Sequence, residues 1–159
     1  MTVNVGFSAG IMLLDEEDAD LGLLRWWDGV KGYAIRYIGG GRANPTIEHC
    51  HRVVLERKLG RPISAYVDHI NGNGLDNQRA NLREATSSQN QANRSKYARN
   101  TATSQFKGVR RERSAWEASI RVQGRFLYLG RFASERQAAK AYNQAAEFHF
   151  GEFASLNDL

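Results

Sequence analysis

Apolar and polar residues alternate with a period of two along the first third of the chain, a pattern typical of short strands. The clearest example is GYAIRYIGGGR (residues 32–42), in which Tyr33, Ile35 and Tyr37 precede a run of glycines. This pattern predicts one strand of a hairpin that ends in a glycine turn. Residues 1–48 as a whole are predicted to form short strands and turns.

The middle of the chain changes from helical to extended periodicity. Residues 47–62, IEHCHRVVLERKLGRP, place apolar side chains at helical spacing and then stop at Gly60 and Pro62. A short strand, SAYVDHI, follows, and its NGNG continuation predicts a tight turn whose glycines supply positive φ. The segment SSQNQANR (87–94) has the composition of the opening of a short helix.

The last third of the chain predicts a different small fold. The runs KGVRRE, AWEASIRV and RFLYLGRF are joined by tight connections, which favours a three-stranded antiparallel meander. Parity within the middle run places Trp116, Ala118, Ile120 and Val122 on one face, with Glu117, Ser119 and Arg121 on the other.

A helix is predicted to follow the meander, over SERQAAKAYNQAAEFHF (134–150). Ser134 and Gln137 have the spacing of a capping box, and Gly151 ends the segment. The predicted apolar stripe consists of Ala138, Ala141, Tyr142, Ala145 and Ala146, with Phe148 or His149.

Charge is unevenly distributed along the 159 residues. Residues 1–48 have a net charge of −3, residues 49–98 of +4, residues 99–131 of +6 and residues 132–159 of −2. Two consecutive basic blocks are typical of a surface that binds a polyanion, although a solvated basic face without a partner gives the same pattern. The segment 95–105, which is polar and has no periodicity, is predicted to be a linker.

The remaining bulk features favour a reducing, cytoplasmic setting. Cys50 is the single cysteine, so an intramolecular disulfide is excluded, and a small buried apolar role suits it. No apolar run is long enough to cross a bilayer, and the N-terminus lacks the basic region of a signal peptide.

The segment 67–94 concentrates polar chemistry around one acid–imidazole pair. Nine of its 28 residues carry side-chain amides, and Asp68 and His69 stand near its start. A carboxylate suits a hard divalent cation, and a neutral imidazole can accept a proton from water near pH 7. Together they suit phosphodiester hydrolysis. Taken alone, however, Asp68 could be a turn cap and His69 a core histidine.

This segment resembles the His–Asn–His (HNH) endonuclease motif of the ββα-metal fold, in the phage and intron homing branch. The resemblance rests on D-H-x-[ND]-G-[ND], then N-x-x-x-N-L-R, then Q-N-x-x-N, over residues 47–97. It implies that His69 is the general base, that Asp68 is a metal ligand and that Asn81 pins the loop that orients the base. It further implies that Asn90 completes the metal site, with Asn93 as a second choice.

The third motif position departs from the family name, because Asn90 stands where a histidine is expected. One carboxylate and one amide oxygen favour Mg²⁺ or Mn²⁺ over Zn²⁺, which prefers nitrogen or sulfur ligands. The HCHR run could suggest a metal clamp, but DNA contact or packing suits His49 and His51 better, since no second cluster accompanies them. His149 is predicted to be structural.

Residues 104–159 resemble a second family, the Apetala/ethylene-response-factor DNA-binding domain. The matching elements are K-G-V-R, W-x-A-x-I-R, Y-L-G-x-F, A-A-x-A-Y-x-x-A-A and G-E-x-A-x-L-N. The resemblance implies a three-stranded sheet in the DNA major groove with the helix behind it. It implies base-facing roles for Arg110, Arg113, Arg121 and Tyr128, and phosphate contacts for Lys107, Arg111 and Arg125. A first connection about one residue shorter than in the plant form puts the role of Arg113 in question.

The predicted architecture is α+β: a ββα-metal nuclease domain (1–98), a linker (99–104) and a small sheet packed on one helix (105–159). The predicted function is that of a metal-dependent DNA endonuclease of homing type. It would act on double-stranded DNA as a monomer or homodimer without an evident protein partner, in the host cytoplasm if it is encoded by a phage. The alternative is a non-catalytic DNA-binding regulator. An RNA-binding role is disfavoured because few aromatic residues interrupt the basic block 49–98.

Overall fold

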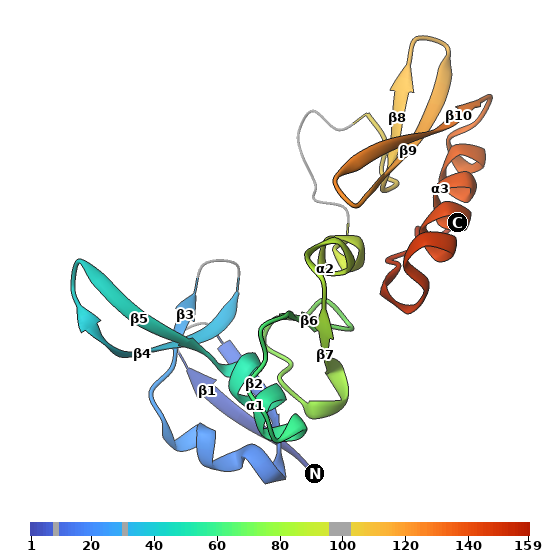
Figure 1. Ribbon diagram of the computed structural model, residues 1–159. Helices are drawn as coiled ribbons and strands as arrows, with labels where there is room; N and C mark the ends of the chain where they lie inside the picture. Colours follow the sequence, from blue (N-terminus) through green and yellow to red (C-terminus); the bar gives the residue numbers. More distant parts are fainter. Residues whose placement is uncertain (8–9, 30–31, 96–102) are drawn as a thin grey trace. The chain divides into compact units, whose positions relative to one another are not determined.

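The computed structural model describes residues 1–7, 10–29, 32–95 and 103–159 (Figure 1). It combines helices with antiparallel strands, which confirms the α+β prediction. The chain divides into two compact units, Met1–Ala85 and Thr86–Leu159. The domain boundary predicted between residues 98 and 99 therefore falls within the second unit, and most of the predicted linker lies outside the described residues. Within the described residues, no helix has the length and apolar content needed to cross a membrane.

The first unit begins with a hairpin and a 3-10 helix. β1 (Thr2–Phe7) pairs with β2 (Gly10–Asp15), and η1 (Glu16–Leu23) follows. Alternation in β2 directs Met12 and Leu14 inward, where both are fully buried. The 3-10 helix adds Leu21 to the same core, so the N-terminal segment forms one wall of the unit that carries the candidate site.

A three-stranded antiparallel sheet comes next, in the order β3-β4-β5. Its strands are β3 (Trp27–Gly29), β4 (Tyr33–Gly41) and β5 (Asn44–His49). β5 runs directly into α1 (Cys50–Leu59), which ends at Gly60 with φ +65°, as the Gly–x–Pro signal predicts. α1 buries Cys50, Val54 and Leu55 in the core, which confirms the apolar role predicted for the cysteine.

The predicted strand with the acid–imidazole pair is β6 (Tyr66–His69), and it pairs with β7 (Leu82–Ala85). A polar loop and the short η2 (Arg79–Asn81) connect the two strands. Backbone hydrogen bonds tie this loop to β2, from Leu13 N to Leu75 O and from Asn77 N to Leu13 O, each 2.9 Å long. The loop is therefore anchored to the N-terminal hairpin as well as to its own strands.

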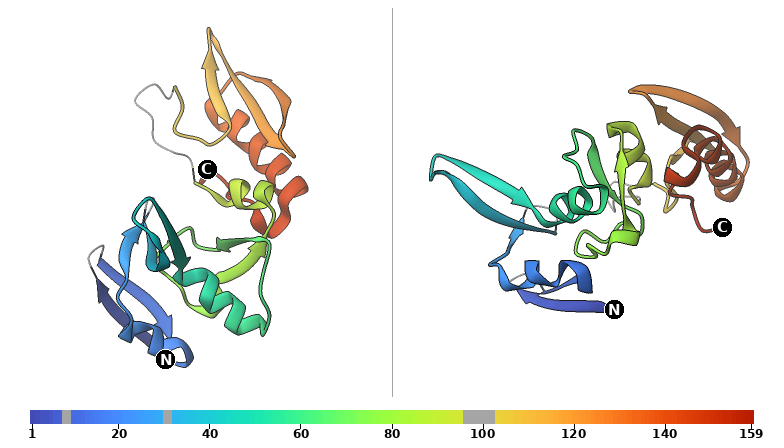
Figure 2. Two further views of the ribbon diagram at one scale, coloured as in Figure 1. Left: turned by 60° about the vertical axis from the view of Figure 1, so that its left-hand side comes forward. Right: turned by 60° about the horizontal axis from the view of Figure 1, so that its bottom comes forward.

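The second unit starts with α2 (Ser87–Asn93), whose N-terminus carries a capping box between Thr86 and Gln89. The predicted meander follows as β8 (Val109–Glu112), β9 (Ala115–Val122) and β10 (Arg125–Phe132), with β9 in the centre. α3 (Glu135–Phe150) and η3 (Gly151–Phe153) complete the unit. α3 packs against one face of the sheet, as Figure 2 also shows.

Alanines on α3 allow the helix to approach the sheet closely, and the predicted Ser134–Gln137 capping box is present. The apolar stripe observed on α3 differs in part from the predicted one. Ala139 is fully buried, whereas Phe148 is 84% exposed and His149 is exposed as well. Phe150 packs into the core instead, because the helix period carries positions 142, 146 and 150 onto the sheet side.

Candidate functional site

Asp68 and His69 close β6 at the point where the polar loop begins. Both are buried, with 3% and 5% of their surface exposed. As neighbours in a strand, their side chains leave opposite faces of the two-stranded sheet. A carboxylate and an imidazole are thus held on rigid backbone at one strand end, in a region of low solvent content.

Asp68 lies directly opposite Arg83 in the β6–β7 register. The Nε of Arg83 donates to the Oδ2 of Asp68 at 2.9 Å, and the arginine side chain is only 13% exposed. This ion pair fixes the direction of the carboxylate. Sequence motifs alone did not single out Arg83, although its position in the N-L-R element was the available signal.

His69 is oriented by Asn77, a residue that the sequence interpretation missed. The Nε2 of His69 lies 3.2 Å from the Oδ1 of Asn77, which is fully buried. The amide nitrogen of Asn77 donates to the carbonyl oxygen of Leu75 at 3.5 Å, so the amide oxygen faces the imidazole. An oxygen acceptor requires a proton on Nε2, which places the basic lone pair of neutral His69 on Nδ1.

Aromatic rings surround His69 on the strand side. Tyr33 stacks on it at a centroid distance of 5.7 Å, and His51 meets it edge-on at 5.1 Å. His49 lies 5.1 Å beyond His51, so the three imidazoles form a row. This arrangement gives His49 and His51 packing roles at the site.

Burial keeps these imidazoles neutral. It lowers the pKa of His69, against the opposing effects of the hydrogen bond to Asn77 and the nearby carboxylates of Asp68 and Asp76. Burial also lowers the pKa of His51 to about 3, aided by the adjacent His69 and His49 rings, and it lowers the pKa of His49. A neutral His69 is the protonation state that a general base requires at neutral pH.

Asn81 ties the two ends of the loop together. Its side-chain oxygen accepts from the backbone nitrogen of Asn71 at 3.0 Å, and its amide donates to the carbonyl of Asp76 at 2.8 Å. Its own carbonyl accepts from the backbone of Ile70 at 2.9 Å, directly after His69. These bonds tie the loop to Asn81, and the part that this loop plays in orienting the base stays a prediction.

The other amides of the loop also bond within the loop. Asn71 donates to Asp76 at 2.7 Å and accepts from the backbone of Asn73 at 2.9 Å. Asn73 accepts from the backbone of Leu75 at 3.1 Å. These amides stabilise a loop that has few apolar residues, so the loop keeps its shape without a core of its own.

The donor set suits a hard cation. Asp68 offers carboxylate oxygen, and the candidate partners Asn90 and Asn93 offer amide oxygen, which Mg²⁺ and Mn²⁺ accept. Asn90 and Asn93 lie on α2, in the second unit, so their approach to Asp68 stays a prediction. Across the described ranges, no three His, Cys, Asp or Glu side chains are arranged to hold a metal ion, and the HCHR run is no exception.

The sheet of the second unit presents a polar outer face, opposite the face that α3 covers. Cross-strand register places Arg110, Glu117 and Arg131 in one row, and Arg121 beside Phe126 in another. The guanidinium of Arg110 is bound by Glu117, with distances of 3.0 and 2.7 Å from Nε and Nη2 to Oε2. Arg121 stacks on Phe126, 4.4 Å from the ring centroid.

Tyr128 lies on this outer face with 62% of its surface exposed, and Phe126 is 71% exposed. Leu129 packs inward, on the face opposite Tyr128. The register shift between Tyr128 and Gly130 is a bulge that sequence parity did not predict, and it places Arg131 opposite Glu117 and Phe132 opposite Trp116. The sequence interpretation also missed Phe126, although its place opposite Arg121 in the meander was the available signal.

Three predicted phosphate or base contacts lie elsewhere. Arg111 points to the opposite side of the sheet, 5.6 Å from the centroid of Trp116. Arg113 occupies the β8–β9 turn with φ +53°. The ammonium of Lys107 donates to the carbonyl oxygens of Ala92 and Arg94, and burial lowers its pKa to about 8. Lys107 therefore caps the end of α2.

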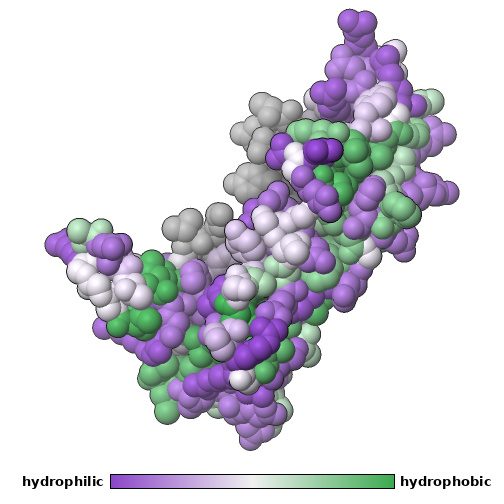
Figure 3. All heavy atoms as spheres, in the orientation of Figure 1, coloured by the Kyte–Doolittle hydropathy of each residue, from purple (hydrophilic) through white to green (hydrophobic). Residues whose placement is uncertain are grey.

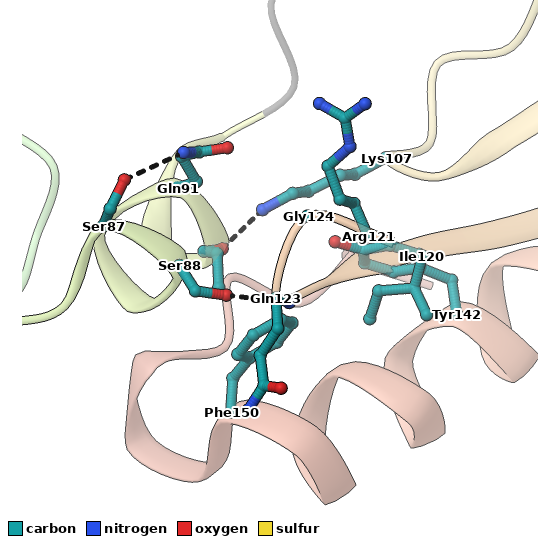
Figure 4. A pocket seen from close by; sticks show the side chains of 11 residues that line it. Ser87, Ser88, Gln91, Lys107, Ile120, Arg121, Gln123, Gly124, Tyr142 and Phe150 are labelled. Carbon is teal, nitrogen blue, oxygen red and sulfur yellow. Dashed lines mark hydrogen bonds between the residues drawn. The ribbon is translucent and has the colours of Figure 1, made fainter. Parts of the chain in front are cut away.

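Lys107 also lines a pocket of about 430 Å³ within the second unit, shown in Figure 4. α2 contributes Ser87, Ser88 and Gln91 to its rim, and Tyr142 and Phe150 form part of its apolar floor. Ser88 accepts a hydrogen bond from the backbone of Gln123, and Ser87 accepts one from Gln91. The contact between Ser88 and Gln123 attaches α2 to the sheet, whereas the bond between Ser87 and Gln91 lies within α2.

Comparison with known proteins agrees with the geometry. The HNH endonuclease family matches residues 48–92, the span from the end of β5 through most of α2. An uncharacterized HNH endonuclease of Acanthamoeba polyphaga mimivirus, L560, is 36% identical over 137 residues, covering 85% of this chain and 67% of the relative. No solved structure matches. The chain belongs to the HNH endonuclease family.

Proposed function

We propose that this nuclease is a metal-dependent DNA endonuclease of homing type in which His69 is the general base. The observation that carries the proposal is the contact between His69 Nε2 and Asn77 Oδ1, in a buried site beside Asp68. It leaves the proton-accepting nitrogen of a neutral imidazole at a fixed position. Membership of the HNH family supports the same reading of the site.

The proposed reaction begins with Nδ1 of His69 removing a proton from water. The hydroxide attacks the phosphorus in line with the leaving 3′ oxygen, and the bond between phosphorus and that oxygen breaks. The 3′ oxygen takes a proton from solvent water, which gives a 5′ phosphate and a 3′ hydroxyl. Asp68 and Asn90 would hold Mg²⁺ or Mn²⁺, which when bound stabilises the charge that develops on the phosphate and the leaving oxygen. Asn81 keeps the loop closed behind His69, so the base does not have to be repositioned during the reaction.

The outer face of β8–β10 is proposed to bind double-stranded DNA. A β-sheet with exposed arginines can enter the major groove, where an arginine contacts guanine through two hydrogen bonds. Arg121 is the best placed for this, since Phe126 holds its guanidinium and, among the described residues, no acidic side chain is paired with it. Tyr128 lies nearby on β10 and supplies a further polar contact. Arg125 pairs with Val122 at the start of β10 and so leaves the other face of the sheet, which removes it from this surface.

A non-catalytic DNA-binding role is the second candidate. The ion pair between Asp68 and Arg83 favours it, because the guanidinium already compensates the carboxylate that a metal would need. The intact set of Asp68, His69 and Asn81 favours catalysis.

The two candidates are separated by incubating supercoiled plasmid with the purified full-length protein in Mg²⁺, in Mn²⁺ and in EDTA. The nuclease proposal expects open circles in one or both metals and none in EDTA, with 5′ phosphates at the nicks. Bound but uncut plasmid in every lane, with source genomic fragments included as targets, would support the non-catalytic role. Linear product from the outset would indicate paired cuts by a dimer.

The targeting role is tested with Arg121→Ala in the full chain. Loss of one bidentate guanine contact should weaken binding of the preferred duplex by about 1–3 kcal/mol and relax selectivity at that position. Arg111→Ala, which removes an equal charge from the opposite face, is the matched control. Equal effects of the two substitutions would remove the base-reading role of the outer face.

A further inference from the structure

The ends of β4 and β5 form a two-stranded ribbon that no other described residue covers on either face. Every residue from 37 to 47 is exposed, and we call this segment the outer ribbon. β3 pairs with β4 only over residues 33–35, so beyond that point both strand edges are also open. Figure 1 and the right-hand view of Figure 2 show the ribbon projecting from the sheet.

The ribbon is unsuited to a purely structural role. None of its side chains belongs to the core of its unit, yet Tyr37, Ile38 and Ile47 keep 53%, 53% and 43% of their surface exposed. In Figure 3 hydrophilic, neutral and hydrophobic residues lie side by side at this end of the molecule. An exposed apolar surface of this kind, mixed with polar groups, is typical of a contact surface.

The charge of the ribbon favours a polyanion. Residues 37–47 contain no Asp or Glu, and Arg42 stands in the two-residue turn at the tip. At the root, Arg36 is paired with Glu48, and Arg25 lies 5.2 Å from the centroid of Trp27, which contacts Tyr37. Arg42 is thus the charged group that projects farthest from the sheet.

The two strands that carry the outer ribbon begin and end at the candidate active site. Tyr33, the first residue of β4, stacks on His69, and His49 at the end of β5 belongs to the same row of rings. From the Ile35–His49 pair to the tip, about six residues of strand span ~20 Å at 3.3 Å per residue. In DNA that distance corresponds to roughly six base pairs, at 3.4 Å per nucleotide.

We infer that the outer ribbon enters the DNA major groove about half a helical turn from the phosphodiester cut at His69. The groove admits a two-stranded β-ribbon, and thymine methyl groups there provide apolar partners for Ile38 and Ile47. Gly40, at φ +76°, permits the tight bend: an added Cβ would lie 2.2 Å from the carbonyl oxygen of Asn44. This inference rests on the proposed function and adds a second sequence-reading element to it.

The test uses full-length protein carrying His69→Ala, so that bound DNA is not cut. In a second protein, residues 38–46 are replaced by Asn-Gly, which joins the paired Tyr37 and Ile47 by a two-residue turn. A preferred duplex is enriched from a pool with a randomised central block, and guanine N7 methylation is then compared for both proteins. Two further variants are compared. Arg42→Ala removes one positive charge from the ribbon, and its control Arg61→Ala removes one positive charge outside it.

The His69→Ala protein with the complete ribbon should protect a block of guanines from methylation. This block should lie roughly six base pairs from the position at which the active protein cuts. The shortened ribbon should lose that block and retain the rest, and Arg42→Ala should weaken it while Arg61→Ala does not. Identical protection by both proteins overturns the inference alone. If the shortened ribbon leaves the protection unchanged but halves the molar mass that light scattering gives for the parent, the inference is overturned too, and the ribbon is assigned to self-association. Absence of any protection overturns the proposed function together with the inference.

Discussion

The side chain of Asn77 contacts His69, with 3.2 Å between Oδ1 and Nε2, and Asn77 belongs to a loop that is itself hydrogen-bonded to β2. Because an amide oxygen cannot donate, the contact selects one tautomer of the imidazole. Asn77→Leu, which has similar volume but no acceptor, should reduce the cleavage rate roughly 10- to 100-fold, as loss of an orienting partner commonly does. The KM for DNA should change little, since Asn77 is fully buried.

Asn77→Asp is the matched variant, because it keeps an oxygen acceptor at the same position and should retain most of the activity. Long-range proton–nitrogen NMR spectra report the His69 tautomer independently of cleavage. The wild type and Asn77→Asp should show the proton on Nε2, and Asn77→Leu a mixture. If Asn77→Leu kept both the tautomer and the rate, Asn77 would have no positioning role.

Arg79 neutralises a carboxylate that water does not reach. Asp18 is fully buried, and Arg79 donates to it from Nε at 2.6 Å and from Nη2 at 3.1 Å. Arg57 reaches the same carboxylate only at 3.4 Å and binds the exposed Asp20 more closely. Arg79→Ala should therefore lower the free energy of unfolding by about 3 kcal/mol, because it leaves a buried charge poorly paired.

The measurement is urea unfolding followed by the fluorescence of Trp26 and Trp27, in a Trp116→Phe background that silences the second unit. Arg61→Ala is the control, since it breaks the exposed ion pair with Glu84 and should cost about 1 kcal/mol or less. Equal losses in the two variants would show that the Asp18 ion pairs have no special weight.

The stability of the first unit should decrease in mild acid because of its buried imidazoles. Burial lowers the pKa of His51 from 6.5 to about 3, so below pH 6.5 the unfolded chain takes up a proton that the folded unit does not. The free energy of unfolding should be constant above pH 6.5 and fall below it by about 1.4 kcal/mol per pH unit from this group. The lowered pKa values of His49 and His69 act in the same direction.

The same fluorescence assay, repeated in EDTA between pH 8 and pH 5, measures this slope above the range in which most carboxylates titrate. His51→Gln should make the slope shallower, whatever its effect on stability at neutral pH. A slope that His51→Gln leaves unchanged would mean that His51 takes up its proton in the folded unit as readily as in the unfolded chain.

Local patterns in the sequence were sufficient to predict the elements that carry the site. The Ser134–Gln137 capping box, the glycine stop after α1 and the alternation of β9 depend on neighbouring residues, so each was predicted correctly. The Asn77 contact was not predicted because it joins the last residue of β6 to a residue of the following loop, at a spacing that has no helical or strand period. The Phe148 and Phe150 positions were misassigned because both are aromatic, and only the register of α3 on the sheet distinguishes them.

Tertiary contacts also explain why Lys107 and Arg111 lie away from the outer face of the C-terminal sheet. Lys107 was expected at a phosphate from its motif position, yet its ammonium lies between carbonyls at the end of α2, a helix thirteen or more residues earlier in the chain. Arg111 follows Arg110 directly and so faces the opposite side of β8. The outer ribbon had no predicted role, because its significance lies in the absence of cover on both faces, which sequence periodicity does not reveal.

In the proposed function, His69 performs the chemistry and does not merely support the fold. The most direct measurement compares wild type and His69→Ala on the same supercoiled DNA, with nicking in Mg²⁺ or Mn²⁺ and Kd in EDTA determined in parallel. Nicking by His69→Ala should fall by at least about 100-fold, the range for loss of a general base, while the Kd stays within about twofold. Cleavage by His69→Ala at a rate near that of the wild type would contradict the proposed role of His69.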